Sequence, residues 1–406
     1  MHWSWNVTGA GAVLRGTMTK PRRHRMPSAN PLKTAETLER ILGDDVHARR
    51  VLSLANGVVG VLHAATLAVT AIGKAYSEVI GGDPKHGVKQ VDRMLSNEGL
   101  AMTDLLPLWV RFVVGQRKEI VVAMDWTDFD DDGHTTLAIS MMTSHGRATP
   151  LMWKTVDKSS LKGKRNDYQY ELVEQLHAAL PDEVRIKLLA DRGFGDHKLY
   201  DLLATLGWDY VIRFRGSIVV EDQHGDVRPA TERVPKTGRA VMLRKARVTR
   251  ARYEVPAVVL VHAKKMKESW CLASSLSEQD AKSVVKLYGK RFTIEETFRD
   301  KKDPRFGMGL LHARVSSTDR RDRLLFLAAI AHALLTLLGA AGERAKLDRH
   351  LKVNTVKTRT LSLFNQGLHW YRALPNMKPE RLEILMPAYE RELRDHEVFA
   401  RVFGLI

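Results

Sequence analysis

Apolar residues recur at helical spacing between residues 31 and 118, which predicts a series of short helices in this part of the chain. The segment 51–73 contains no Asp, Glu, Lys or Arg, but Asn56 and three glycines predict two short helices rather than one long one. A Gly-Gly-Asp-Pro break follows at 81–84. The helix expected after this break places basic residues opposite apolar ones, at Lys85, Lys89 and Arg93.

The pattern changes from helices to strands at Glu119. The run 120–127 is almost wholly apolar, as expected of a buried strand, and the acidic sequence 130–133 predicts a hairpin turn after it. Further strands are expected at 135–142, 150–155, 184–189 and 210–215, and helices at 168–179 and 196–206. This β-β-β-α-β-α-β order predicts an α/β fold with a ribonuclease-H-like core, in which helices cover both faces of a mixed sheet.

The chain departs from that order after residue 215. Strand patterns at 239–247 and 255–262 predict a β-rich insertion, and an amphipathic helix over 278–302 is expected to return to the core. The segment 324–342 has no Asp, Glu, Lys or Arg and is long enough to cross a membrane. Polar residues near its middle and the lack of a partner span predict a buried core helix instead.

The charge of the chain indicates a polyanionic partner. Its net charge is +17 and its pI is near 9.9, whereas its 44% hydrophobic content is ordinary for a globular protein. Nucleic acid is the expected partner, although a basic protein indifferent to nucleic acid has the same composition. A membrane partner is not expected, because attraction to a membrane needs a hydrophobic anchor as well. Cys271 is the only cysteine, which excludes an intramolecular disulfide and fits a cytoplasmic location.

Residues 1–30 carry five Lys or Arg residues and no acid. Two interpretations stay open for them: a basic arm that contacts DNA, or sequence upstream of a true start at Met18 or Met26. The first residues lack a continuous apolar core, so no secretory signal is expected.

One run of the chain combines a phenol, a carboxylate and several cations at helical spacing. On a helix, offsets of 0, 3, 7, 11 and 14 fall on one face. The residues at these offsets are Tyr288, Arg291, Glu295, Arg299 and Lys302. A structural salt-bridge face mixes acids and bases more evenly. A single acid among cations that bind phosphate suits a metal ligand beside a nucleic-acid backbone.

This spacing resembles the Y-(2)-R-(3)-E-(6)-K motif of bacterial insertion-sequence transposases, the DDE-type enzymes of the family numbered four. The residues that follow Glu295 are most similar to the transposon Tn-ten type of cut-and-paste transposase. The resemblance extends from about residue 51 to about residue 358. It implies excision of the element at its terminal inverted repeats and strand transfer to target DNA, through a hairpin intermediate.

The resemblance also implies three acids that are both catalytic residues and metal ligands, namely Asp125, Asp191 and Glu295. Asp125 lies in the first predicted strand, Asp191 directly after the fourth, and Glu295 on the later helix. Phosphodiester cleavage and joining are served by two Mg²⁺ ions, which prefer carboxylate oxygens as ligands. We expect Mg²⁺ as the cofactor, with Mn²⁺ able to replace it. No phosphate-binding Gly-rich motif is found, so no use of ATP is expected.

Other acids near these three have simpler interpretations. Asp130, Asp131 and Asp132 are expected to be solvated turn residues. Asp128 is expected to lie next to the metal ligands without binding the metal itself. Glu296 points about 100° away from Glu295 on a helix, which disfavours it as a ligand.

Several further residues are expected to contact DNA. The resemblance assigns this role to Tyr288, Arg291, Arg299 and Lys302, and to a tryptophan, here Trp270, that stacks on a base flipped out at the hairpin tip. A core tryptophan on a strand of the insertion is the alternative for Trp270. Lys85, Lys89 and Arg93 belong to the region that recognises the inverted repeats in the family, and a solvated helix face is the alternative for them.

The resemblance completes the division of the chain. The expected segments are the arm at 1–30, a helical domain that binds DNA ends at 31–118, the core at 119–215, the β-rich insertion at 216–275, the second part of the core at 276–345, and a helical C-terminal segment at 346–406. The expected partners are double-stranded DNA and a second copy of the chain, in a bacterial, nucleoid-associated setting. Two alternatives remain: a ribonuclease-H-like nuclease that cuts without joining, and an inactive DNA-binding protein.

Overall fold

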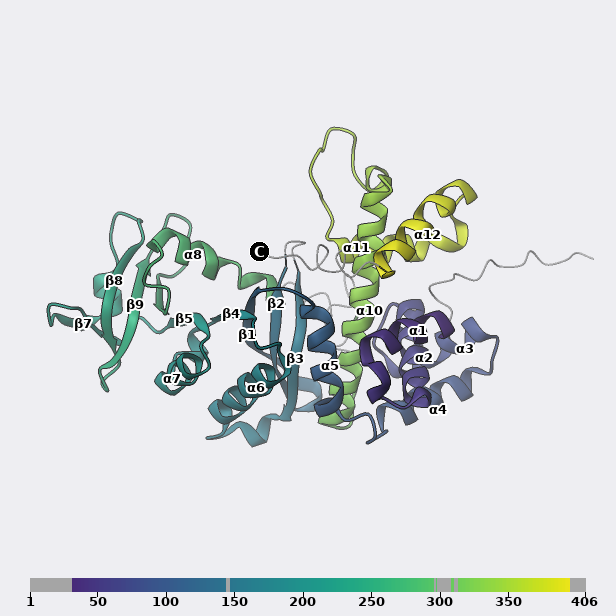
Figure 1. Cartoon of the computed structure of the whole chain (residues 1–406), viewed down its shortest axis with the longest axis horizontal. Helices are drawn as coiled ribbons and strands as arrows, with labels where there is room; N and C mark the ends of the chain where they lie inside the picture. The colour runs from purple at the N-terminus through teal and green to yellow at the C-terminus, as the bar shows by residue number, and fades with distance from the viewer. Residues whose placement is uncertain (1–30, 144–146, 296, 298–307, 310–312, 395–406) are drawn as a thin grey trace, which may run out of the picture.

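The computed structural model describes residues 31–143, 147–295, 297, 308–309 and 313–394 of a mixed α/β protein (Figure 1). From residue 31 onward, five α-helices precede the sheet: α1 (Pro31–Leu42), α2 (Ala48–Ala64), α3 (Val69–Ile80), α4 (Pro84–Leu95) and α5 (Met102–Val114). The predicted division of segment 51–73 is confirmed, because α2 and α3 meet there at 98°. The chain turns at Ala65, whose left-handed backbone (φ 49°) ends α2.

The predicted β-β-β-α-β-α-β order is confirmed. Its elements are β1 (Glu119–Phe129), β2 (His134–Met142), β3 (Ala148–Asp157), α6 (Arg165–Ala179), β4 (Arg185–Ala190), α7 (His197–Thr205) and β5 (Asp209–Phe214). The expected hairpin turn between β1 and β2 ends at Gly133, where a φ of 65° favours glycine.

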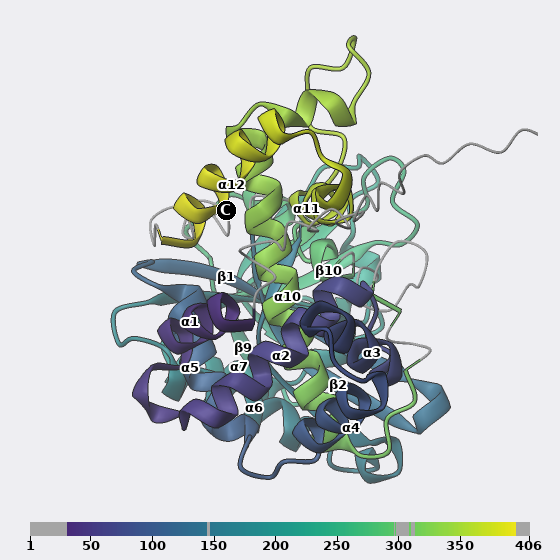
Figure 2. The same cartoon turned by 90° about the vertical axis from the view of Figure 1, so that its right-hand side faces the viewer.

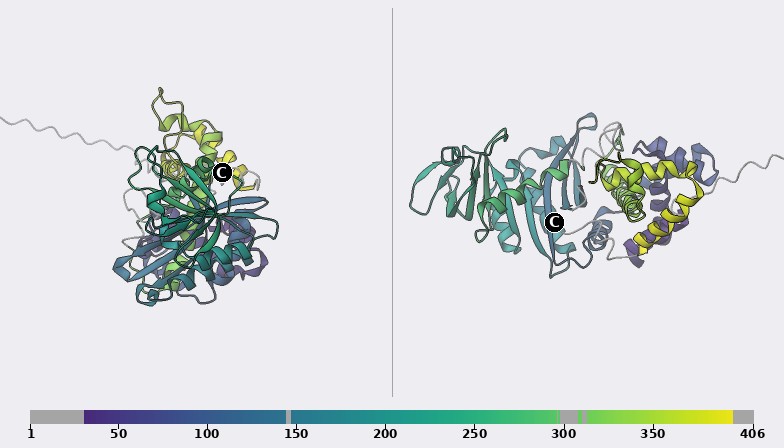
Figure 3. Two further views of the ribbon diagram at one scale, coloured as in Figure 1. Left: turned by 90° about the vertical axis from the view of Figure 1, so that its left-hand side faces the viewer. Right: turned by 90° about the horizontal axis from the view of Figure 1, so that it is seen from above.

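The predicted β-rich stretch before the last acid is also found. Its strands are β6 (Val219–Glu221), β7 (Val227–Pro229), β8 (Val241–Val248), β9 (Tyr253–Val261) and β10 (Trp270–Ser274). These strands extend the first sheet, since β10 pairs with β5. The described strands form one sheet in the order β3-β2-β1-β4-β5-β10-β9-β8-β6-β7. Only the β1–β4 and β4–β5 pairs are parallel, and the sheet is strongly twisted (Figure 3).

Alternate residues of the central strands face two separate apolar layers. Even-numbered residues such as Val122 and Leu188 belong to the larger layer, which α6 and α7 help to form. Odd-numbered residues such as Ala123 and Leu189 face a smaller layer under α8 (Ala281–Gly289). Figure 1 accordingly shows α8 on the opposite side of the sheet from α6 and α7.

Helix α10 (Thr318–Arg344) passes between the β3 edge of the sheet and helices α1–α4 (Figures 1 and 2). Among the described residues, α10 is the one unbroken helix that is long and apolar enough to cross a membrane. However, 94% of its most apolar stretch is buried inside the protein. The predicted buried core helix is thereby confirmed. Two further helices, α11 (Leu363–Ala373) and α12 (Pro379–Arg394), pack against α10.

The first turns of α10 join it to the helices before the sheet through two arginines. Arg320 donates to the Asp92 carboxylate (2.6 Å) and to the Asp92 backbone carbonyl (3.2 Å) at the end of α4. Arg323 is buried and donates to the carbonyls of Leu95 (2.8 Å) and Leu100 (2.9 Å). The Leu95 carbonyl, at the C-terminal end of α4, therefore receives a charged donor.

The two residues between these arginines join α10 to the sheet instead, because consecutive helical side chains point about 100° apart. Arg321 is fully buried, forms an ion pair with Asp132 and donates to His134 (3.2 Å). Asp322 accepts from the Thr155 backbone N–H (3.1 Å) and hydroxyl (2.5 Å). The interpretation of Asp132 as a solvated turn residue is therefore wrong, since its side chain is only 12% exposed.

The expected continuous helix over 278–302 is also wrong. Helix α8 ends at Gly289, and the next backbone N–H groups bond three residues back, from Lys290 to Leu287 and from Arg291 to Tyr288. Helical geometry resumes at Phe292. Glycine is a poor helix former, and the tighter turn after it redirects the chain toward the sheet.

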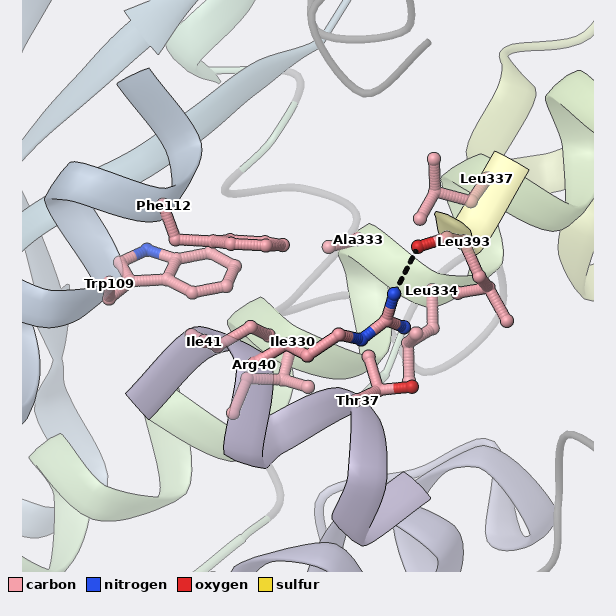
Figure 4. A pocket seen from close by; sticks show the side chains of 10 residues that line it. All are labelled: Thr37, Arg40, Ile41, Trp109, Phe112, Ile330, Ala333, Leu334, Leu337 and Leu393. Carbon is pink, nitrogen blue, oxygen red and sulfur yellow. Dashed lines mark hydrogen bonds between the residues drawn. The ribbon is translucent and has the colours of Figure 1, made fainter. Parts of the chain in front are cut away.

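A small apolar cavity of about 20 Å³ lies where α1, α5, α10 and α12 meet (Figure 4). It has room for about one water molecule. Arg40 crosses it and donates to the Leu393 carbonyl (3.0 Å), which ties α1 to α12. This cavity is a packing gap rather than a ligand site.

We predict that Arg321→Met destabilises the protein by about 3 kcal/mol or more, because it removes one partner of a buried ion pair and leaves Asp132 uncompensated. Chemical denaturation would measure this as a lower unfolding midpoint, with part of the loss recovered in the double variant Arg321→Met, Asp132→Asn. Lys118→Met, which breaks the exposed pair with Glu183, should change the midpoint little. Equal midpoints for wild type and Arg321→Met would contradict the structural role.

Candidate active site

Two of the three predicted acids lie side by side at one edge of the sheet. In the parallel pair β1–β4, Met124 is level with Ala190, so Asp125 and Asp191 occupy the next positions of adjacent strands. Both are odd-numbered and continue the face that α8 covers. Apolar runs bury the two strands, and each acid stands where burial gives way to partial exposure.

The backbone after β4 holds Asp191 in place. Its Oδ1 accepts a hydrogen bond from the Gly193 N–H (2.7 Å), which starts the turn that follows the strand. A Cβ at position 193 would lie 3.0 Å from that same oxygen. Glycine at 193 therefore permits a tight turn that fixes one carboxylate oxygen of Asp191.

Glu295 comes from the helical turns after α8. Ile294, directly before it, is buried in the layer under α8. Thr297, two residues after it, is 1% exposed, and its Oγ1 accepts from the Ala148 N–H (2.7 Å) on β3. These two anchors place the Glu295 carboxylate over the same edge of the sheet, with its side chain 53% exposed.

A single guanidinium bridges two of these carboxylates. Arg291 donates from Nη2 to Glu295 Oε1 (2.8 Å) and from Nη1 to Asp125 Oδ2 (3.4 Å). Its side chain is only 8% exposed, and that of Asp125 is 19% exposed. The ion pair of Arg291 with Glu295, four residues apart, was not predicted from the sequence, nor was the contact to Asp125, 166 residues away.

The pKa of Asp125 reports how closely the acids are grouped. Burial raises it to about 6, Arg291 opposes this rise, and the negative charges of Asp191 and Glu295 add to it. Burial alone would lower the pKa of Arg291, but Tyr288 and the three acids together raise it. All three carboxylates thus act on the same small region.

The donors at this edge suit a hard divalent cation. Carboxylate oxygens are the ligands that Mg²⁺ and Mn²⁺ prefer, and the position between Asp125 and Glu295 already accommodates positive charge. Within the described part of the chain, no three His, Cys, Asp or Glu side chains are gathered closely enough to hold one ion together. Two of the acids are instead held by Arg291.

Trp270 and Tyr288 lie beside the acids in an aromatic cluster. The Trp270 ring meets that of Tyr288 edge to face at 4.9 Å and lies tilted on Phe292 at 5.9 Å. Tyr288 is 1% exposed, and burial raises its pKa to about 12. Trp270 is partly exposed at the start of β10. Of the five residues expected on one helical face, Arg299 and Lys302 lie outside the described residues.

A second ionic group, not predicted from the sequence, lies next to the acids. Glu268 accepts from Arg213 Nη2 (2.7 Å) and Arg192 Nη1 (3.2 Å), and this draws the loop before β10 to the turn that carries Asp191. Arg192 could have been predicted as a site residue, because it directly follows Asp191 in the sequence. Arg213 lies within strand β5, and nothing in the sequence around it points to the site.

The other acids near the site are now placed. Asp196 caps the start of α7, since its carboxylate accepts a hydrogen bond from the Lys198 N–H (3.4 Å). Asp128 and Asp130 both pair with Lys158. Glu296 lies outside the described residues.

The structure places the basic residues of α4 on the other side of α10 from the sheet (Figures 1 and 2). Lys85, Lys89 and Arg93 are exposed, whereas the opposite face of α4 is buried. α4 packs closely against α3, because a Cβ at Gly73 would lie 2.4 Å from the Val88 Cα. The predicted basic and apolar faces of this helix are therefore confirmed, while contact with DNA remains a prediction.

Comparison with known families bears directly on this site. The model of the transposase DDE domain matches residues 117–334, more than half of the chain, and its range contains Asp125, Asp191 and Glu295. No curated protein matches the chain.

We predict that Asp125→Asn stabilises the metal-free protein at neutral pH. The native pKa of about 6 exceeds the ordinary value of 3.8, so the unfolding free energy falls as pH rises from about 4 to 6 and stays lower above that. The variant escapes this loss and should gain up to about 3 kcal/mol at pH 7.5. Denaturation of both proteins at pH 4 and pH 7.5 checks this, since the difference should vanish near pH 4. A difference of the same size at both pH values would contradict it.

Proposed function

This chain belongs to the family of transposases with a DDE domain, and we propose that it catalyses cut-and-paste transposition of a bacterial insertion sequence of family four, in the manner of the Tn-ten type. In this proposal it cleaves the strands at the terminal inverted repeats and joins the freed ends to target DNA. The observation that carries the proposal is the meeting of Asp125 and Glu295 on one buried arginine beside Asp191.

Asp125, Asp191 and Glu295 would hold Mg²⁺, with Mn²⁺ as a substitute. The bound ions would supply a deprotonated oxygen nucleophile and neutralise charge on the phosphate. The chain's own task is to orient the carboxylates. The Trp126 N–H (2.9 Å) fixes one oxygen of Asp125, and the Gly193 N–H fixes one of Asp191. ATP is not required, since each phosphodiester bond that breaks is matched by one that forms in transesterification, or by hydrolysis.

Cations beside the acids would hold the DNA strand that is cut. Arg291, Arg299 and Lys302 are assigned to phosphates near the scissile bond, and Tyr288 supports them from the aromatic cluster. Guanidinium groups suit this role because their planar donors bind two phosphate oxygens at once.

Recognition of the inverted repeats is assigned to the helices before the sheet. Lys85, Lys89 and Arg93 form an exposed basic face on α4, and contacts from such residues to phosphates make binding weaken as salt rises. The ion pair between Arg320 of α10 and Asp92 of α4 connects this face to the helix that also carries Arg321 and Asp322. Each end would occupy one active site, so two copies of the chain would meet in the assembled complex.

We predict that replacing Asp125, Asp191 or Glu295 by Ala abolishes nicking and joining while binding to transposon ends survives. Mobility-shift and cleavage assays on one preparation would decide between these properties. Asp130→Asn, which changes a highly exposed acid of the neighbouring turn, should cleave normally. Wild-type cleavage by any of the three alanine variants would remove that residue from the site.

We predict that Trp270→Ala permits the first nick but slows hairpin formation. In the proposed route, the 3′-hydroxyl released by the first nick attacks the opposite strand, and a base at the hairpin tip must unpair. Stacking on a tryptophan favours an unpaired base by roughly 1–3 kcal/mol, which corresponds to a loss of roughly 5- to 150-fold in rate.

Trp270→Phe should restore part of that rate, because it keeps an aromatic ring beside Tyr288. Denaturing gels of labelled ends separate nicked, hairpin and resolved products. Normal hairpin yield from Trp270→Ala would identify Trp270 as a packing residue. No hairpin from wild type would exclude the route itself.

A further inference from the structure

The Arg291 guanidinium has two competing sets of partners. In the DNA-free protein its two Nη atoms are directed to Asp125 and Glu295. The function proposed above requires the same group at a phosphate of the transposon end. The same carboxylate oxygens must also receive the metal ions. These contacts compete, because a carboxylate oxygen that accepts from a guanidinium is not free to coordinate a metal ion.

From this competition we propose that Arg291 is a latch, which occupies two of the metal-binding acids until a DNA phosphate draws its guanidinium away. The inference rests on the proposed function and adds an order to it, in which end binding precedes full metal loading. Arg291 is thus a positioning residue for the reaction as well as a DNA contact.

The surroundings of Arg291 allow such an exchange. Among the residues that the structure describes, none accepts a hydrogen bond from the buried Nε atom, so this donor of the guanidinium is unused in the DNA-free arrangement. The contact to Glu295 lies on the open side, where that side chain is half exposed, while the contact to Asp125 lies deeper. A phosphate that approaches from solvent therefore meets the Glu295 side of the bridge first.

The backbone around Arg291 also differs from a rigid helix. Lys290 and Arg291 lie between α8 and the turn that begins at Phe292, and their N–H groups bond three residues back. A short irregular segment between anchored elements can change its dihedral angles without unfolding either side. Tyr288 and Ile294, both buried, hold the two ends of this segment.

The test measures Mn²⁺ binding by the loss of the free-ion electron paramagnetic resonance signal. Full-length wild type is titrated alone and with a duplex of the transposon end that ends at the cleaved 3′ position and lacks the 3′-hydroxyl, so that no chemistry follows. The same titrations are made with Arg291→Gln and with Arg291→Lys, which keeps the charge but loses the planar fork. Arg192→Gln is the matched control, because Arg192 is a cation beside Asp191 whose partner is Glu268.

Without DNA, Arg291→Gln should bind Mn²⁺ about tenfold more tightly than wild type, a coupling of ordinary allosteric size. The end duplex should tighten binding by wild type to a similar degree and leave Arg291→Gln nearly unchanged. Arg192→Gln should stay close to wild type in both titrations. If Arg291→Gln does not fold, as judged by circular dichroism, Arg291→Lys takes its place and should still bind more tightly than Arg192→Gln.

Two results would overturn the latch. One is an Mn²⁺ affinity in the Arg291 variant that is no higher than in wild type, and the other is an equal increase in Mn²⁺ affinity on adding the end duplex to wild type and to the variant. Failure of the proposed function looks different. In that case Asp125→Ala, Asp191→Ala and Glu295→Ala would retain the Mn²⁺ binding of wild type. Loss of Mn²⁺ binding in those three variants, with no effect of Arg291, would remove the latch and leave the metal site standing.

Discussion

Three carboxylates cannot share a partly buried corner of a protein without a compensating positive charge, and Arg291 supplies that charge here. Each negative charge raises the cost of the next, and burial raises it further. The pKa of Asp125 stays raised despite Arg291, which shows that one guanidinium does not fully offset burial and the neighbouring negative charges. The geometry around this arginine follows from that requirement. The helix must break after Gly289 to bring the guanidinium down to the sheet, and Ile294 and Thr297 must anchor the turns that follow.

The framework that carries the acids is stabilised by α10, which lies along the β3 edge of the sheet. Four consecutive charged residues, 320–323, point in different directions around this helix and reach α4, the β1–β2 turn, β3 and the chain after α4. The β1–β2 turn directly follows the strand of Asp125. The basic helix assigned to end recognition and the strand that holds the first acid are therefore fixed to adjacent positions on one rigid helix. The match to the transposase DDE domain extends into this helix.

Much of this arrangement could be predicted from the sequence, because local patterns determine it. The family resemblance implied Asp125, Asp191 and Glu295 as the site acids, and apolar runs placed the first two at the ends of predicted strands. The features that were missed depend on partners distant in sequence. Asp132 looks like an ordinary turn residue until Arg321, 189 residues later, buries it. The break after Gly289 could not be predicted, because the amphipathic pattern continues across it. The break is needed so that Arg291 can reach Asp125, which lies on a strand far away in the sequence.

The most direct test of the account is a crystal structure of the chain with an end duplex and Mn²⁺, in which anomalous scattering locates the ions. The account predicts Mn²⁺ at the carboxylates of Asp125, Asp191 and Glu295, with the Arg291 guanidinium on a phosphate of the duplex. Mn²⁺ bound away from these acids, or Arg291 still bridging Asp125 and Glu295 while the duplex occupies the site, would contradict it.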